Sequence, residues 1–246
     1  MKLYEILNIK KYDITSIVGA GGKTTLMFKL ANELKDKGKV LFTTTAKIYR
    51  PNENEVDYLY IGKDGYDFIK NNKDYGIYAY GEEVNKEDKL IGIKPNLVNN
   101  LKSSFDYILI EADGSKKKDL KAWNENEPII CSKNNKYIGV LSLKTINIEI
   151  NNDNIHRIEE FLNLTNSNIG EKVSLEILIK LIFNKKGLFK NSMGENILFL
   201  NKAENIKDDI LTLFLDKIIN KNKEVKLLNK IVYGSLKYNS FNYIDL

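Results

Sequence analysis

The stretch Asp13-Ile-Thr-Ser-Ile-Val-Gly-Ala-Gly-Gly-Lys-Thr-Thr25 decides the fold of this chain. Its first part, residues 13–18, is rich in β-branched side chains and predicts a buried strand that runs into a glycine turn. Residues 23–37 follow with apolar side chains at helical spacing, and Gly38 stands where a helix commonly ends. We therefore expect a strand, a glycine-rich turn and a helix in direct succession.

The same alternation of strands and helices continues along the chain. The expected strands are 40–43, 58–61, 76–80, 90–93, 106–111, 137–143, 196–200 and 230–233, and the expected helices are 67–71, 95–102, 155–162, 174–183 and 207–219. Strands that alternate with helices predict an α/β fold with a mostly parallel sheet and helices on both of its faces. No linker rich in Gly, Ser or Pro divides the chain, so we predict a single domain over residues 1–246 with a helical insertion at about 146–190.

Composition excludes several classes of protein. With 246 residues, of which 43% are hydrophobic, the chain has enough apolar material for a core, which excludes wholesale disorder. Its apolar runs are too short to span a bilayer, so we expect no membrane partner. The single cysteine, Cys131, excludes an internal disulfide and, with no signal peptide, predicts a cytoplasmic protein. The net charge of +5 is scattered lysine, with arginine only at Arg50 and Arg157, which argues against a nucleic-acid partner.

The glycine-rich turn has the sequence of a phosphate-binding loop. Glycines let backbone amides wrap phosphate oxygens, and the helix N-terminus that follows adds an anion site. Lys23 would reach the β- and γ-phosphates of ATP or GTP, and the Thr24 hydroxyl would ligate Mg²⁺. The usual spacing needs glycine where this chain has Ile17, so the loop is a shortened one, of the kind seen in Mur-type ligases and some accessory ATPases and GTPases. The expected nucleotide-binding residues of this P-loop NTPase-like fold are Gly19, Ala20, Gly21, Gly22, Lys23, Thr24 and Thr25.

One acid ends the apolar strand expected at residues 106–111, and a second acid comes two residues later. Glu111 ends the strand where a metal-binding acid of a P-loop protein belongs, and Asp113 lies where it could sense the γ-phosphate. The run Thr43–Thr45 ends another strand, and Thr44 is our candidate among its hydroxyls for Mg²⁺ or its waters. The alternatives are a solvated loop after the strand for the acids and ordinary β-propensity for the threonines.

Two further motifs lie later in the chain. Asn201, Lys202 and Glu204 follow an apolar strand and are similar to the N-K-x-D motif with which GTPases read guanine, although glutamate replaces the expected aspartate. His156 and Arg157 could bind a phosphate or an anionic substrate, and we place Arg157 with Lys23 and Asp113 among the catalytic candidates. The alternative interpretations are a polar loop for the first motif and a pair at a helix N-terminus for the second.

Taken in order, the motifs resemble those of the YqeC family, and the resemblance extends over about residues 10–235. The segments that carry it are Val18–Thr25, Thr43–Thr45, Glu111–Ser115, Lys121, Glu127–Pro128, His156–Arg157 and Asn201–Lys202. The resemblance implies a nucleotide-binding protein that assists maturation of selenium-dependent molybdenum hydroxylases or of their selenium- and molybdenum-containing cofactor. It therefore implies such a hydroxylase, or a cofactor-maturation protein, as partner. The chain departs from the family pattern at Ala46–Lys47 and at Glu204.

Three functions stay open, and they differ in what, if anything, accepts the phosphoryl group. Water as acceptor gives a switch-like NTPase, which the Asn201-Lys202 motif favours. A small molecule as acceptor gives a kinase-like or Mur-ligase-like ATP-dependent enzyme, which the short loop favours. A nucleotide-gated carrier or scaffold would bind nucleotide without turning it over.

Overall fold

The computed structural model describes residues 1–246 and divides into two compact units. The first unit consists of residues 1–17, 24–114 and 129–136, and the second of residues 18–23, 115–128 and 137–246. The chain thus passes repeatedly from one unit to the other, and the first passage falls within the strand that precedes the glycine loop. The single domain over residues 1–246 stays a prediction.

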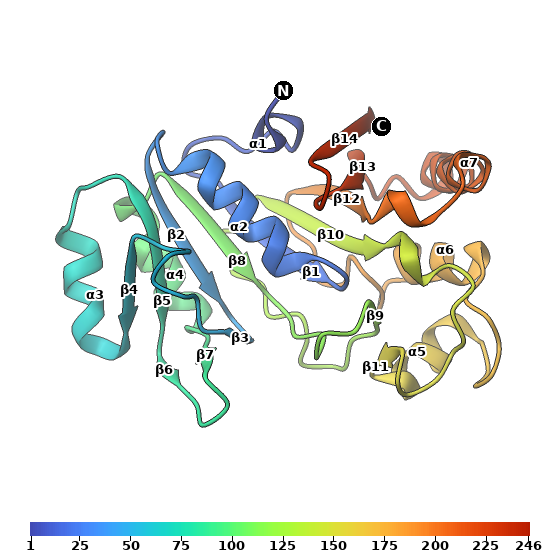
Figure 1. Ribbon diagram of the computed structural model, residues 1–246, viewed down its shortest axis with the longest axis horizontal. Coiled ribbons are helices and arrows are strands. Elements are labelled where there is room, and N and C mark those ends of the chain that lie inside the picture. The colour runs from blue at the N-terminus through green and yellow to red at the C-terminus, as the bar shows by residue number, and fades with distance from the viewer. The chain divides into compact units, whose positions relative to one another are not determined.

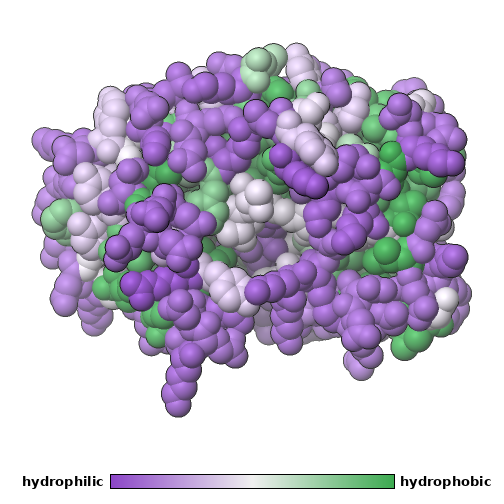
Figure 2. Space-filling model, in the orientation of Figure 1, coloured by the Kyte–Doolittle hydropathy of each residue, from purple (hydrophilic) through white to green (hydrophobic).

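The first unit is an α/β structure built on a parallel sheet (Figure 1). Its elements are α1 (Leu3–Ile6), β1 (Ile14–Gly19), α2 (Lys23–Leu34), β2 (Lys39–Thr44), β3 (Lys47–Tyr49), β4 (Tyr58–Ile61), α3 (Gly62–Asn71), β5 (Gly76–Gly81), β6 (Glu83–Val84), β7 (Lys89–Ile91), α4 (Pro95–Leu101), η1 (Lys102–Ser104) and β8 (Tyr107–Glu111). The main strands lie in the order β1-β8-β2-β5-β4, and every neighbouring pair is parallel. A small antiparallel sheet of β3, β7 and β6 accompanies them, and the charged tip of its β6–β7 hairpin projects from the surface in Figure 2.

Helices cover both faces of this parallel sheet. Alternate side chains of β2 point to opposite faces, as the pleat of a strand requires. Phe42 stacks on Phe28 of α2, with ring centroids 4.5 Å apart. Leu41 belongs instead to a buried cluster with Ile69 of α3 and Val98 of α4. The expected mostly parallel α/β fold class with helices on both faces is therefore confirmed.

The second unit also combines parallel strands with helices. Its elements are β9 (Leu120–Lys121), β10 (Lys136–Ser142), η2 (Leu143–Thr145), β11 (Ile155–His156), α5 (Ile158–Thr165), α6 (Leu175–Phe183), β12 (Glu195–Asn201), η3 (Ala203–Asn205), α7 (Asp208–Val225), β13 (Lys230–Ser235) and β14 (Ser240–Asp245). Its strands lie in the order β10-β12-β13-β14, with β12 and β13 parallel and β14 antiparallel at the edge. Helices α5 and α6 fall inside the range predicted for the helical insertion.

Two local predictions differ from the structure. The helix expected at residues 155–162 begins only at Ile158, because Ile155 and His156 pair as β11 with β9 and Arg157 adopts a left-handed conformation. Helix α3 starts at Gly62 rather than at residue 67. Glycine has a low helix propensity, so the glycines in its first turns do not indicate a helix in the sequence. One of these, Gly65, is needed for packing, because a Cβ there would lie 2.6 Å from the Cβ of Tyr60.

Hydrophilic residues predominate on the face shown in Figure 2, with smaller apolar areas between them. None of the helices is both long enough and apolar enough to cross a membrane.

Candidate functional site

The glycines of the loop are required by close packing in the second unit. Gly21 and Gly22 have φ angles of 85° and 144°, which L side chains rarely adopt. A Cβ on Gly21 would lie 2.3 Å from the Cβ of Ser142, and one on Gly22 would lie 2.4 Å from Nδ2 of Asn201. The loop backbone therefore lies directly against the ends of β10 and β12, and any side chain at these positions would push it away.

Hydrogen bonds hold the loop in the same place. The amide of Ala20 donates to the carbonyl of Val140 at 3.1 Å. The Asn201 side chain donates through Nδ2 to the carbonyl of Gly21 at 2.8 Å, and its Oδ1 accepts from the amide of Leu236 at 3.1 Å. Asn201, which is 4% exposed, thus links the loop to the segment after β13. The predicted motif residue is brought to the loop, where it supports the backbone.

Lys23 lies over the loop that precedes it. Its ammonium group donates to the carbonyl of Gly19 at 2.7 Å, and the residue is only 4% exposed. A lysine ammonium has three donors and no acceptor, so it can bond the loop carbonyl and a phosphate oxygen together. The side chain is thus held against the glycine loop, and its contact with a nucleotide stays a prediction.

In the first unit, the residue after Lys23 contacts the predicted metal-binding acid. The Thr24 hydroxyl, in the first turn of α2, donates to Oε2 of Glu111 at 2.7 Å. Glu111 ends β8 and is 5% exposed, so its carboxylate is largely withdrawn from solvent. Hydroxyl and carboxylate oxygens are the ligands that Mg²⁺ prefers, and Mg²⁺ takes only one or two from protein when phosphates and waters complete its shell. This pair fits that requirement, and no group of three or more His, Cys, Asp or Glu side chains is arranged to hold a metal ion.

The threonine run connects strand ends. The hydroxyl of Thr43 donates to the carbonyl of Tyr80 at 2.7 Å, and that of Thr44 donates to the carbonyl of Glu111 at 2.6 Å. The oxygen of Thr44 also accepts from the amide of Ala46 at 2.9 Å. Thr44 therefore bonds the backbone of Glu111 and that of Ala46 through one hydrogen bond each, and its direct ligation of Mg²⁺ stays a prediction.

Asp113 is completely buried in the first unit, two residues beyond Glu111. The amide of Ala112 donates to the carbonyl of Ile17 at 3.0 Å, which continues the pairing of β1 and β8 past the acid. Because it is buried, Asp113 is not the solvated loop residue of the alternative interpretation. Its role toward a γ-phosphate stays a prediction. Thr25, also predicted to bind nucleotide, is exposed in the first turn of α2.

Lys202 and Glu204 have different surroundings. Lys202 adopts a left-handed conformation, with φ of 65°, and its ammonium pairs with Oδ1 of Asp119 at 2.5 Å. Glu204 lies exposed in η3, where its carboxylate is open to solvent. Sequence reasoning missed Asp119 as the partner of Lys202, because it lies in a lysine-rich loop with no motif of its own.

Arg157 belongs to a charged cluster in the second unit. Its Nε donates to Oε2 of Glu127 at 3.0 Å, and the ammonium of Lys121, which is 1% exposed, reaches the same oxygen at 3.2 Å. Burial raises the pKa of Glu127, but the bond from Arg157 and the charge of Lys121 outweigh it, so the pKa lies below its usual value. Burial together with Lys121 and Arg157 lowers the pKa of His156 to about 4. This histidine is therefore neutral at pH 7, and the catalytic role of Arg157 stays a prediction.

Comparison with known proteins identifies the family. The family described as YqeC protein matches residues 15–159 of the chain. A protein of Escherichia coli (strain K12), named uncharacterized protein YqeC, is 31% identical over 185 residues, which cover 74% of this chain and 72% of that protein. The chain belongs to the YqeC family. The match begins in β1 and includes the loop, Glu111, Asp113 and Arg157. No solved structure matches the chain.

Replacing Asn201 in this YqeC-family chain is expected to destabilise it. Asn201→Ala leaves the half-buried carbonyl of Gly21 and the amide of Leu236 without these partners, which costs about 1–3 kcal/mol in the free energy of unfolding. Urea denaturation measures the loss. Glu204→Ala, in the same motif but exposed, is the matched control and should change stability by less than about 0.5 kcal/mol. Equal effects of the two substitutions would contradict this assignment.

The one histidine allows a clean titration. We expect the NMR signals of His156 to titrate with a midpoint near pH 4 in the folded protein, and near its ordinary value of about 6.5 in urea. Because the unfolded chain binds this proton at higher pH, His156 contributes stability above pH 6.5 that is lost as the pH falls toward 4. A folded-state midpoint close to 6.5 would show that the ring is neither buried nor beside the two cations.

Proposed function

We propose that this chain is a Mg²⁺-dependent protein that binds a nucleoside triphosphate and transfers or hydrolyses its γ-phosphate. The observation that carries the proposal is the 2.7 Å hydrogen bond between the Thr24 hydroxyl and the Glu111 carboxylate. It joins the first turn of a helix that follows a glycine loop to the acid that ends a central parallel strand. These are the two oxygen groups that a phosphate-bound Mg²⁺ would use.

The other groups of the site have roles that follow from their positions. Backbone amides of the loop would bind phosphate oxygens, and Lys23 would stabilise the charge that develops on the γ-phosphate. Bound Mg²⁺ would neutralise phosphate charge. Asp113, buried beyond Glu111, would orient the attacking water or another acceptor. Thr44 positions Glu111 through the backbone bond described above.

Base recognition would fall to Glu204. The amide of Asn201 is bonded to the loop and to Leu236, so it supports the phosphate site. The Glu204 carboxylate is exposed, and a carboxylate accepts hydrogen bonds only, which suits the N1–H and amino group of guanine and repels N1 of adenine. The short loop favours ATP, so the choice between ATP and GTP rests on this side chain.

We further propose that the cellular role is to assist maturation of selenium-dependent molybdenum hydroxylases or their cofactor. Membership of the YqeC family supports this role. The partner would be such a hydroxylase or a cofactor-maturation protein, contacted in the cytoplasm.

Lys23→Ala is expected to weaken nucleotide binding and abolish turnover without unfolding the chain. The substitution removes a point charge from the β- and γ-phosphates and leaves the glycine loop intact. Calorimetry with ATP and GTP in Mg²⁺, together with a phosphate-release assay, measures both effects. Lys29→Ala, later on the same helix, is the control and should bind and turn over as the wild type does. Wild-type affinity and turnover in the Lys23 variant would end the proposal.

The same assay separates the two acids. Glu111→Gln should raise the Mg²⁺ concentration that is needed for binding or turnover, because it weakens a metal ligand. Asp113→Asn should lower turnover with little change in nucleotide affinity, because it acts on the attacking group. Identical Mg²⁺ titrations for both variants and the wild type would contradict these roles.

Competition between ATP and GTP tests the base assignment. If Glu204 reads guanine, GTP should bind at least about tenfold more tightly, the effect of one charge-assisted hydrogen bond, and Glu204→Ala should remove the preference. A preference for ATP that the substitution leaves unchanged would assign Glu204 to an ordinary surface loop.

A further inference from the structure

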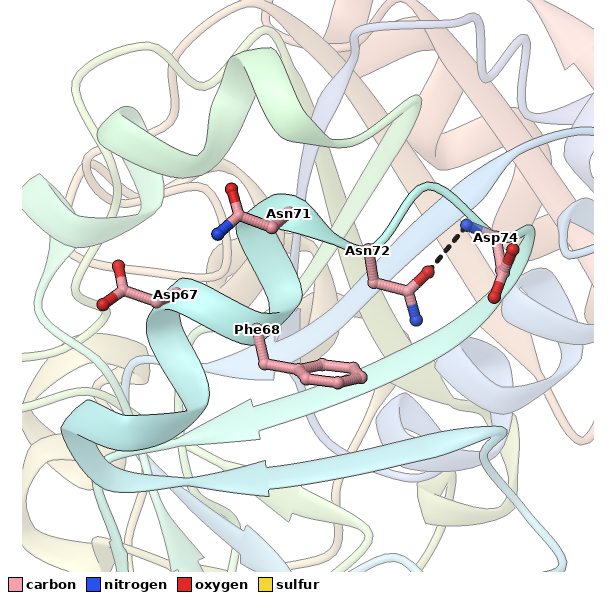
Figure 3. Close-up of a pocket in the computed structure, with 5 residues that line it drawn as sticks. All are labelled: Asp67, Phe68, Asn71, Asn72 and Asp74. Atoms are coloured by element: carbon pink, nitrogen blue, oxygen red, sulfur yellow. Dashed lines mark hydrogen bonds between the residues drawn. The ribbon is translucent and has the colours of Figure 1, made fainter.

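Two pockets of the first unit lie at opposite edges of its parallel sheet. One is lined by Asp67, Phe68, Asn71, Asn72 and Asp74, at the end of α3 and just before β5 begins. Figure 3 shows that its polar side chains point in different directions, and that the Asn72 side chain is bonded to the amide of Asp74. Ligands of parallel α/β sheets bind outside the carboxyl ends of the strands, which is the other edge. This pocket therefore lies away from the edge at which such ligands bind.

The second pocket lies at the carboxyl ends of β4 and β5. Its volume is about 670 Å³, within the range of small-molecule sites. It is lined by Gly62, Lys63, Tyr66, Tyr80, Glu82, Glu83, Lys94 and Leu97.

The inner part of this pocket is aromatic and fixed. Tyr80, on β5, is 2% exposed, and its hydroxyl donates to the carbonyl of Gly62 at 3.0 Å. Burial, with the charge of Glu82, raises the pKa of Tyr80, so this hydroxyl keeps its proton at neutral pH. Tyr66 of α3 and Leu97 of α4 are half-buried and pack against the same core cluster as Tyr80. A planar ring would find apolar and aromatic surface here on rigid elements.

The outer part carries charges of both signs. Glu82 and Glu83 follow β5 directly, while Lys63 lies in the first turn of α3 and Lys94 precedes α4. All four residues are exposed, and within the chain none of these side chains makes a hydrogen bond or ion pair. Their charges sum to zero, so a ligand of one sign would meet as much repulsion as attraction. A ligand that carries both signs would use all four.

The strand register places this pocket on a different face of the sheet from the acid that would bind Mg²⁺. Thr43 of β2 lies opposite Tyr80 of β5, and the next residue, Thr44, lies opposite Glu111 of β8. Successive residues of a strand point to opposite faces of the sheet, and directly paired residues share a face. Tyr80 and Glu111 therefore lie near the same ends of their strands, with their side chains on opposite faces of the sheet.

We propose that the pocket lined by Tyr66, Tyr80, Glu82, Glu83 and Lys94 binds a small aromatic zwitterion as the second ligand of this protein. The ring lies against the two tyrosines and Leu97, the cationic group lies toward Glu82 and Glu83, and the anionic group lies toward Lys63 and Lys94. This goes beyond the proposed function, since the pocket lies on the face of the sheet opposite to the Glu111 side chain and is a ligand site of its own. Binding in the pocket needs no nucleotide.

Four indole compounds of different charge test the binding. L-tryptophan is the zwitterionic probe, and indole, indole-3-acetate and tryptamine are its neutral, anionic and cationic counterparts. We expect L-tryptophan to give saturable NMR shifts in the full chain without nucleotide, with a Kd on the order of 1 mM as its size predicts. The other three should bind at least about threefold more weakly. Absence of saturable binding by L-tryptophan, or equal binding of all four compounds, would overturn the proposal.

Single substitutions then assign each charge. Glu82→Gln should weaken L-tryptophan and tryptamine but leave indole-3-acetate no weaker, and Lys94→Gln should weaken L-tryptophan and indole-3-acetate but not tryptamine. Tyr66→Ala should weaken all four compounds. The matched controls are Asp67→Asn and Lys73→Gln, at the opposite edge of the sheet, which should change nothing. If the controls weaken binding as much as the pocket variants do, the pocket assignment is wrong.

Nucleotide binding by the same variants keeps the two proposals apart. Tyr66→Ala should retain wild-type affinity for ATP and GTP, while Lys23→Ala should retain wild-type affinity for L-tryptophan. If the wild-type protein binds L-tryptophan but neither ATP nor GTP, the proposed function is wrong and the assignment of the pocket stands. The reverse result would remove the pocket alone.

Discussion

The hydrogen bond from the Thr24 hydroxyl to the Glu111 carboxylate is the interaction on which the proposed chemistry depends. It requires that β1 and β8 be parallel neighbours, with Ile17 opposite Glu111. It also requires that α2 begin directly after the glycines, because one more residue would rotate Thr24 by about 100° around the helix. The shortened loop meets both conditions with Lys23 as the first residue of the helix.

The threonines at the end of β2 have a structural part in this arrangement. Their hydroxyls bond carbonyls of the strands on both sides of β2, at Tyr80 and at Glu111. Side-chain bonds to backbone at a strand end replace the ladder bonds that are lost where pairing stops. These bonds keep the ends of β5, β2 and β8 aligned at Tyr80 and Glu111. An aliphatic residue of the same shape would preserve the strand but not this alignment.

The sequence allowed the central elements to be predicted because their signals are local. The β-branched run before Gly19, the apolar run before Glu111 and the proline that opens α4 each act within a few residues. What could not be predicted depends on partners distant in the chain. His156 was expected in a helix but pairs with Lys121, and the ion pair of Lys202 with Asp119 had no signal in the sequence. Motif spacing singled out Glu111 and Asn201 as candidates, yet it could not show that Asn201 holds the loop or that Thr44 is bonded to backbone.

The division of the chain between its units has a consequence for synthesis. The first unit has all of its residues once position 136 has been made, whereas the loop at residues 18–23 belongs with strands that end at Ser142 and Asn201. Domains tend to fold in the order in which they leave the ribosome. The Thr24–Glu111 pair can therefore form early, while Gly21 and Gly22 must wait for Asn201, which lies 180 residues after Gly21. A nascent chain stopped before β12 would already possess Glu111 but would lack the support of its glycine loop.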